Sequence, residues 1–191
     1  AAVAYQLIND RRVGEHMLKD NVRVIAAGNR ESDRGVTSRM PTPLANRFTH
    51  VEVEVDVEAW VDWAQGAGLH PIGTAFMLFR RELLSTFDPA NAEKAFATPR
   101  TWVKALRYYA SNMSDNIKAA AICGAVGEGP GTEFLGFTQI WQDMPDLKKI
   151  IKDPKKHALP EGVGMCYAVS VGLSGMMTLE NVDAIHSFLE R

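Results

Sequence analysis

The stretch VRVIAAGNRESDRGVTSRMPTPLANRF, residues 22–48, joins an apolar run, a polar stretch and a short segment that begins with prolines. Residues 22–27 are apolar except for one arginine and end at Gly28-Asn29, which is typical of a strand buried on both faces of a sheet. The polar and charged residues 30–41 predict a surface loop. Two prolines just after it predict the start of a short helix that runs through Arg47.

The residues on either side of this stretch predict more of the same α/β unit. Apolar residues at helical spacing predict a helix that ends near residue 10, and Gly14 predicts the turn of a short hairpin. Residues 49–55 predict a half-exposed strand, because Val51, Val53 and Val55 alternate with Glu52 and Glu54. Because so few strands cannot close a sheet, we expect the partner strands to lie upstream of Ala1 in a longer protein.

From Asp56 onward the sequence is typical of helices. Asp56 is a candidate cap for a helix with Trp60 and Trp63. Further helices are expected from Pro71, after Thr98, from Ser114 to Ala125, from Thr132 to about Gln142, after Pro145, within 160–177 and within 178–191. The predicted fold class is therefore α+β and mostly α, with an α/β fragment at 1–55 and an all-helical unit at 56–191.

Composition excludes several classes of protein. With 191 residues, 46% hydrophobic residues and a net charge of −2, the chain is neither disordered nor a basic nucleic-acid coat. Its apolar runs are too short to span a membrane. Two distant cysteines indicate no disulfide framework and no zinc site, and they fit a reducing compartment such as the cytoplasm. We expect Cys166 to be a buried, inert thiol, and the glycine-rich stretch 127–131 to be a turn between helices.

Two polar residues of the first unit are candidates for phosphate chemistry. Asn29 follows a predicted strand, where its amide could orient a water against a phosphate; the alternative is that Gly28-Asn29 only turns the chain. Arg47 ends a predicted helix, where its guanidinium could reach the phosphate of a neighbouring subunit. The alternative for Arg47 is a C-terminal arginine that complements the helix dipole.

The third candidate is Arg100, in the first turn of the helix after Thr98-Pro99. The helix dipole disfavours a cation there, so Arg100 should have an anionic partner. That partner is either a bound anionic ligand or a carboxylate such as Glu93 or Asp88.

The order and spacing of these residues resemble the second half of an AAA+ ATPase of the MoxR-like group. The resemblance rests on residues 22–48 quoted above, on VEVEVDVEAWVDWA (51–64) and on FATPRTW (96–102), with weaker likeness in GAVGEGPGTEFLGFTQIWQDMPDLKKIIKDP (124–154). It implies that Asn29 is sensor 1, that Arg47 is an arginine finger acting in trans, and that Arg100 is the sensor 2 arginine of the lid. Met40 and Asn46 depart mildly from the group's usual residues.

The resemblance also implies cofactors and partners. ATP and Mg²⁺ would bind at subunit interfaces of a ring, expected to be a hexamer, which remodels a client protein that often carries a von Willebrand A domain. This sequence has no Walker A or Walker B motif, so we expect the chain alone to hydrolyse no ATP and to hold no tightly bound metal. The alternatives are a non-enzymatic helical interaction module and a DNA-associated motor subunit, and no membrane partner is expected.

Overall fold

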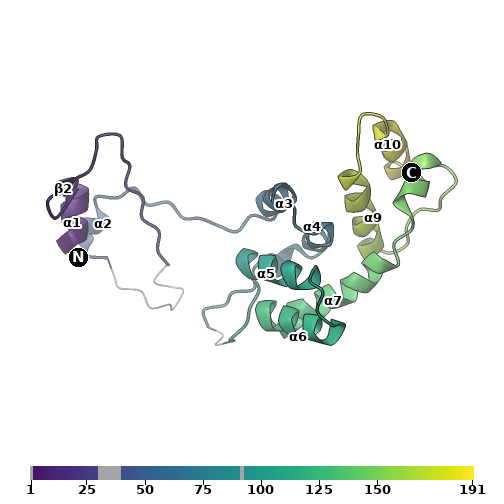
Figure 1. Cartoon of the computed structure of the whole chain (residues 1–191), viewed down its shortest axis with the longest axis horizontal. Helices are drawn as coiled ribbons and strands as arrows, with labels where there is room; N and C mark the ends of the chain where they lie inside the picture. The colour runs from purple at the N-terminus through teal and green to yellow at the C-terminus, as the bar shows by residue number, and fades with distance from the viewer. Residues whose placement is uncertain (1, 30–39, 91–92) are drawn as a thin grey trace. The chain divides into compact units, whose positions relative to one another are not determined.

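The computed structural model describes residues 2–29, 40–90 and 93–191, and its secondary structure is mainly helical (Figure 1). Most of the loop predicted at 30–41 lies outside the described residues. By its internal contacts the chain divides into two units. The first is Ala1–Glu54 with Asp88–Asn91, and the second is Val55–Phe87 with Ala92–Arg191.

In its described residues the first unit holds two helices and one hairpin. They are α1 (Ala2–Asn9), β1 (Arg12–Val13), β2 (His16–Met17) and α2 (Thr42–Ala45). The antiparallel hairpin pairs Val13 with His16, and Gly14 has a φ of +59°, which suits the tight turn between them. The predicted first helix, hairpin and proline-led helix are therefore confirmed, although α2 ends two residues before Arg47.

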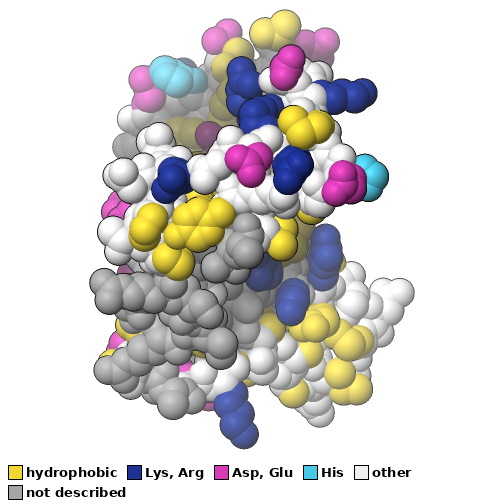
Figure 2. Space-filling model, turned by 90° about the vertical axis from the view of Figure 1, so that its left-hand side faces the viewer, with side chains coloured by type: hydrophobic (Ala, Val, Ile, Leu, Met, Phe, Trp, Pro, Cys, Tyr) yellow, Lys and Arg dark blue, Asp and Glu magenta, His cyan; other side chains and the backbone are white. Residues whose placement is uncertain are grey.

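The two longer strands predicted in this unit are wrong. Residues 22–27 and 49–55 have no regular secondary structure, and the sheet of the described residues contains β1 and β2 alone. Ile25 is 90% exposed and Val51 is 78% exposed; Figure 2 shows hydrophobic side chains at the surface of one face. A strand needs a neighbouring strand for its main-chain hydrogen bonds, and the sheet of the described residues provides none for residues 22–27.

The second unit is built from helices alone in its described residues. In chain order these are α3 (Val57–Gly66), α4 (Pro71–Phe79), the 3₁₀ helix η2 (Arg81–Leu84), α5 (Pro99–Tyr109), α6 (Asp115–Val126), α7 (Glu128–Gln142), α8 (Leu147–Lys152), α9 (Val163–Gly175) and α10 (Val182–Leu189). The predicted cap of α3 is confirmed, since Asp56 Oδ1 accepts a hydrogen bond from the Ala59 N–H at 2.7 Å. The all-helical prediction for this part of the chain is also confirmed.

The start of α7 corrects the prediction of a turn at 127–131. Only Gly127, with a φ of +95°, breaks the helix, and α7 begins at Glu128. Pro130 fits the first turn because its missing N–H has no helical partner there. A Cβ on Gly131 would lie 2.8 Å from Cys123 Cα, so this glycine lets α6 and α7 cross closely.

The core of the second unit is aromatic. Trp102 is fully buried, with ring centroids 5.5 Å from Phe76 and 5.6 Å from Phe134, and its Nε1–H donates to the Leu83 carbonyl at 2.7 Å. A smaller cluster under α8, α9 and α10 contains Ile150, Val169, Leu173, Ile185 and Phe188. These two clusters hold the helices of the second unit in place.

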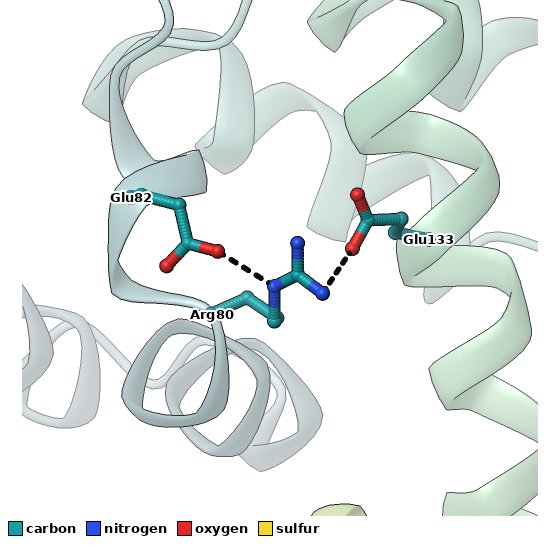
Figure 3. Close-up of polar contacts among 3 residues, drawn as sticks. All are labelled: Arg80, Glu82 and Glu133. Atoms are coloured by element: carbon teal, nitrogen blue, oxygen red, sulfur yellow. Dashed lines mark hydrogen bonds and ion pairs between the residues drawn. The ribbon is translucent and has the colours of Figure 1, made fainter.

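Charged groups also tie the helices together. Arg80, just after α4, contacts Glu82 of η2 at 2.7 Å and Glu133 of α7 at 2.8 Å (Figure 3). Arg81 pairs with Glu58 of α3. No described helix is long and apolar enough to cross a membrane.

Candidate functional site

Arg47 is exposed and is held by residues of its own chain. Its Nε–H donates to Asn9 Oδ1 at 2.6 Å, and an Nη1–H donates to the Pro43 carbonyl. Its guanidinium also lies over the Tyr5 ring, 5.9 Å from the centroid. The contact with a carbonyl of α2 fits the dipole alternative, while the exposed position keeps the guanidinium accessible to an anion from another molecule.

Asn29 is exposed at the end of an extended, irregular segment. The prediction that Asn29 follows a strand is wrong, because residues 22–27 form no strand. Within the described residues no hydrogen bond of its side chain is recorded. Its exposed amide is therefore accessible, and none of the described residues of its own unit is recorded as orienting it.

Arg100 occupies the second position of α5 and is exposed. The helix start is fixed by a capping box, in which Thr98 Oγ1 accepts from the Thr101 N–H at 3.1 Å and Thr101 Oγ1 accepts from the Thr98 N–H at 2.8 Å. Across the described ranges no ion pair or hydrogen bond of Arg100 is recorded. Glu93, in the same unit, does not pair with it, so that expected carboxylate partner is not observed.

The three predicted residues are divided between the two units. Asn29 and Arg47 lie in the first unit and Arg100 in the second. Their convergence on one nucleotide therefore stays a prediction.

Sequence reasoning missed a groove of about 830 Å³ on the second unit. Its lining residues come from the start of α4, the end of α5, and α6 and α7: His70, Tyr109, Ala110, Asp115, Asn116, Lys118, Ala119, Ile122, Leu135, Thr138, Gln139 and Gln142. Amide and hydroxyl side chains, together with the oppositely charged Asp115 and Lys118, surround the aliphatic Ile122 and Leu135 and suit a hydrogen-bonding ligand. The sequence pattern gave little indication of this groove, because its lining residues are spread over four helices.

His70 is the titratable group that packing changes most clearly in this groove. Its Nδ1 accepts from the Ile72 N–H at 3.2 Å, and its ring packs edge-on against Tyr109 with centroids 5.2 Å apart. Burial lowers the pKa of His70 and raises the pKa of Tyr109. Since Nδ1 accepts, the neutral His70 ring carries its proton on Nε2 and can act as a donor.

Two further features concern metal binding and the thiol of Cys166. Residues 2–29, 40–90 and 93–191 contain no cluster of three His, Cys, Asp or Glu residues that could hold a metal ion. Cys166 is exposed rather than buried, and its S–H donates to the Pro160 carbonyl at 3.4 Å, so the prediction of a buried thiol is wrong. The helix pattern placed Cys166 on α9 but could not show that this face of α9 is uncovered.

No protein family, curated protein sequence or solved structure was found to match this chain.

Proposed function

We propose that this chain carries the sensor 1, arginine-finger and lid elements of an AAA+ ATPase of the MoxR-like group. The order of the motifs around Asn29, Arg47 and Arg100 supports the proposal. The observation that carries it is the setting of Arg100: an exposed cation in the first turn of a capped helix, with no carboxylate partner recorded among the described residues.

An anion at the start of α5 would resolve this unfavourable arrangement. A cation beside a helix N-terminus costs about 0.3–1 kcal/mol, and an anion there is favoured by the same dipole. Pro99 has no N–H, and the N–H groups of Thr101 and Trp102 are bonded to Thr98. Among the described residues no hydrogen bond of the Arg100 main-chain N–H or guanidinium is recorded, and a nucleotide phosphate is the anion that suits both groups.

The other residues take roles that fit their chemistry. Asn29 would orient the attacking water, and Arg47 would stabilise charge on the γ-phosphate of a neighbouring subunit. Such arginines contribute about 10³–10⁵ in rate in other phosphoryl-transfer enzymes. Asn9, which accepts from Arg47 Nε–H, would position that guanidinium. In a ring assembled from the longer protein, Arg47→Ala should retain ATP binding and lose most turnover.

ATP and Mg²⁺ need residues that this sequence lacks. Mg²⁺ would neutralise the β- and γ-phosphates, but the Walker residues that hold it are absent from these 191 residues. On this proposal the chain contacts phosphates weakly and hydrolyses no ATP alone. The proposal extends to a hexameric ring in the cytoplasm, with a client protein that carries a von Willebrand A domain.

The test is an NMR titration of the ¹⁵N-labelled chain. ATP and inorganic tripolyphosphate should shift the amide signals of residues 98–102, whereas adenosine should not. Arg100→Gln should abolish these shifts, and the matched control Arg107→Gln, an exposed arginine in the last turn of the same helix, should leave them intact. Equal shifts in wild type and Arg100→Gln would contradict the proposal.

One observation favours the alternative of a non-enzymatic interaction module. The groove lined by His70 and Tyr109 is large enough for a ligand or a peptide segment and uses none of the three predicted residues. If phosphate compounds leave the amide signals of residues 98–102 unchanged while a ligand shifts the amide signals of the groove residues, the interaction module replaces the ATPase as the proposed function. Salt-dependent binding of a DNA duplex would favour the DNA-associated motor instead.

A further inference from the structure

Residues 146–157, here called the basic segment, concentrate positive charge in an otherwise acidic chain. The segment has five lysines against two aspartates, a formal charge of +3 in a chain of net charge −2. All five lysines are exposed: Lys148, Lys149, Lys152, Lys155 and Lys156. Lys149 lies 3.7 Å from Asp146, and no ion pair of the other four is recorded within the described residues. The segment can therefore offer several cations to an acidic partner.

Arg191 extends this positive surface in space, although it is distant in sequence. Its Nη1 donates to the carbonyls of Pro154 and His157, at 2.8 and 3.0 Å. These two residues flank Lys155 and Lys156. The neighbouring acidic side chain, Glu190, contacts His186 at 3.3 Å. A sixth cation is thus fixed beside the two lysines.

An apolar pocket of about 240 Å³ borders the same surface. Its wall is formed by Leu159, Pro160, Cys166, Val169, Ser170, Phe188, Leu189 and Arg191. Arg191 therefore belongs both to the pocket wall and to the basic surface. The pocket is mostly aliphatic and aromatic, and its size suits one branched apolar side chain.

We propose that this surface docks an acidic peptide segment of a partner protein, with one apolar anchor residue in the pocket. Carboxylates of the peptide would pair with Lys155, Lys156 and Arg191 while the anchor fills the space beside Val169 and Phe188. A nucleic-acid backbone would use the cations but leave the pocket unfilled, so the observations favour the peptide. The docking surface does not depend on the proposed nucleotide chemistry, and the two proposals fail separately.

The test uses fluorescence anisotropy with two labelled probes and the whole chain. One probe is a twelve-residue Glu/Asp peptide with a central leucine, and the other has alanine at that position. The leucine peptide should bind about tenfold more tightly than the alanine peptide, because the pocket buries the larger side chain. Equal affinities, or no binding of either peptide at millimolar concentration, would overturn the proposal.

Protein variants separate the two parts of the surface. Lys155→Gln with Lys156→Gln should weaken the leucine peptide about 3–10-fold and reduce its salt dependence. The matched control Lys94→Gln with Lys104→Gln, which removes two exposed lysines elsewhere, should leave binding unchanged.

Ser170→Phe, checked for native helix content by circular dichroism, should remove the preference for leucine over alanine by filling the pocket. Equal weakening by both lysine pairs would contradict the proposal, and so would a 20-base-pair DNA duplex that binds as tightly as the leucine peptide at 150 mM NaCl.

Discussion

The two units differ most in what their apolar residues pack against. In the described residues of the first unit, Leu44 alone is fully buried, while Ile25 and Val53 are 90% and 84% exposed. In the second unit the aromatic cluster around Trp102 is closed to solvent. Both units contain strongly apolar sequence, so hydrophobicity by itself does not decide which one has a core.

The difference follows from how helices and strands form their main-chain hydrogen bonds. A helix forms its hydrogen bonds within one segment, so several amphipathic helices can bury their apolar faces on each other. A strand must bond to a neighbour before its side chains can be buried. The second unit therefore has the features of an independent folding unit, whereas residues 22–27 have no partner strand among the described residues.

Removal of the Trp102 ring from the core of the second unit is the change with the largest expected effect on stability. Trp102→Ala should lower the free energy of unfolding of the second unit by about 3–5 kcal/mol, because a large cavity forms and the hydrogen bond to Leu83 is lost. Ile25→Ala, in the first unit, should change the free energy of unfolding of the chain by less than about 0.5 kcal/mol, because this side chain is already exposed. Urea unfolding followed by circular dichroism measures both, and similar losses would refute the contrast.

A smaller effect is expected where α6 and α7 cross. Gly131→Ala should cost about 1–3 kcal/mol, because its Cβ would meet the main chain of Cys123. Gly136→Ala in the same helix meets nothing within 4 Å and should stabilise the unit by about 0.5–1 kcal/mol. Thermal unfolding of the two variants should thus give shifts of opposite sign.

The helix start that carries Arg100 should respond more weakly still. Thr98→Ala should cost about 1 kcal/mol because the capping box is lost. Ser114→Ala, at the equivalent position of α6, should cost only a few tenths, since the Ser114 side chain makes no capping hydrogen bond. If both variants lose the same stability, the cap does not fix the start of α5.

The smallest predicted effect is a pH dependence at His70. Because burial lowers its pKa in the folded state, the unfolded chain binds the proton more readily. Its contribution to stability is therefore complete above its usual pKa near 6.5 and is lost as the pH falls below that value. His70→Asn keeps a capping acceptor without titrating, and should flatten the stability curve between about pH 7 and 5. An unchanged slope would show that His70 does not govern it.

The sequence predicted the helical unit well because its signals are local. Asp56, Thr98 and Pro71 mark helix starts by chemistry that acts within one turn. The errors fell where the outcome depends on distant residues: the strand at 22–27 needs partner strands, and Cys166 is exposed because no other described element of its own unit covers it.

The candidate sites also differ in whether they depend on local or on distant residues. The capped helix that carries Arg100 could be predicted from its own residues, whereas the groove at His70 arises from residues of four helices and could not.

Hydrogen exchange of the whole chain, followed by mass spectrometry, tests the contrast between the two units most directly. We predict strong protection for peptides from α5 and α7, and exchange close to the unfolded rate for residues 23–29, where no main-chain hydrogen bond is recorded among the described residues. Protection of residues 23–29 comparable to that of α5 would contradict the account, because it would mean that this segment already has its partner strands.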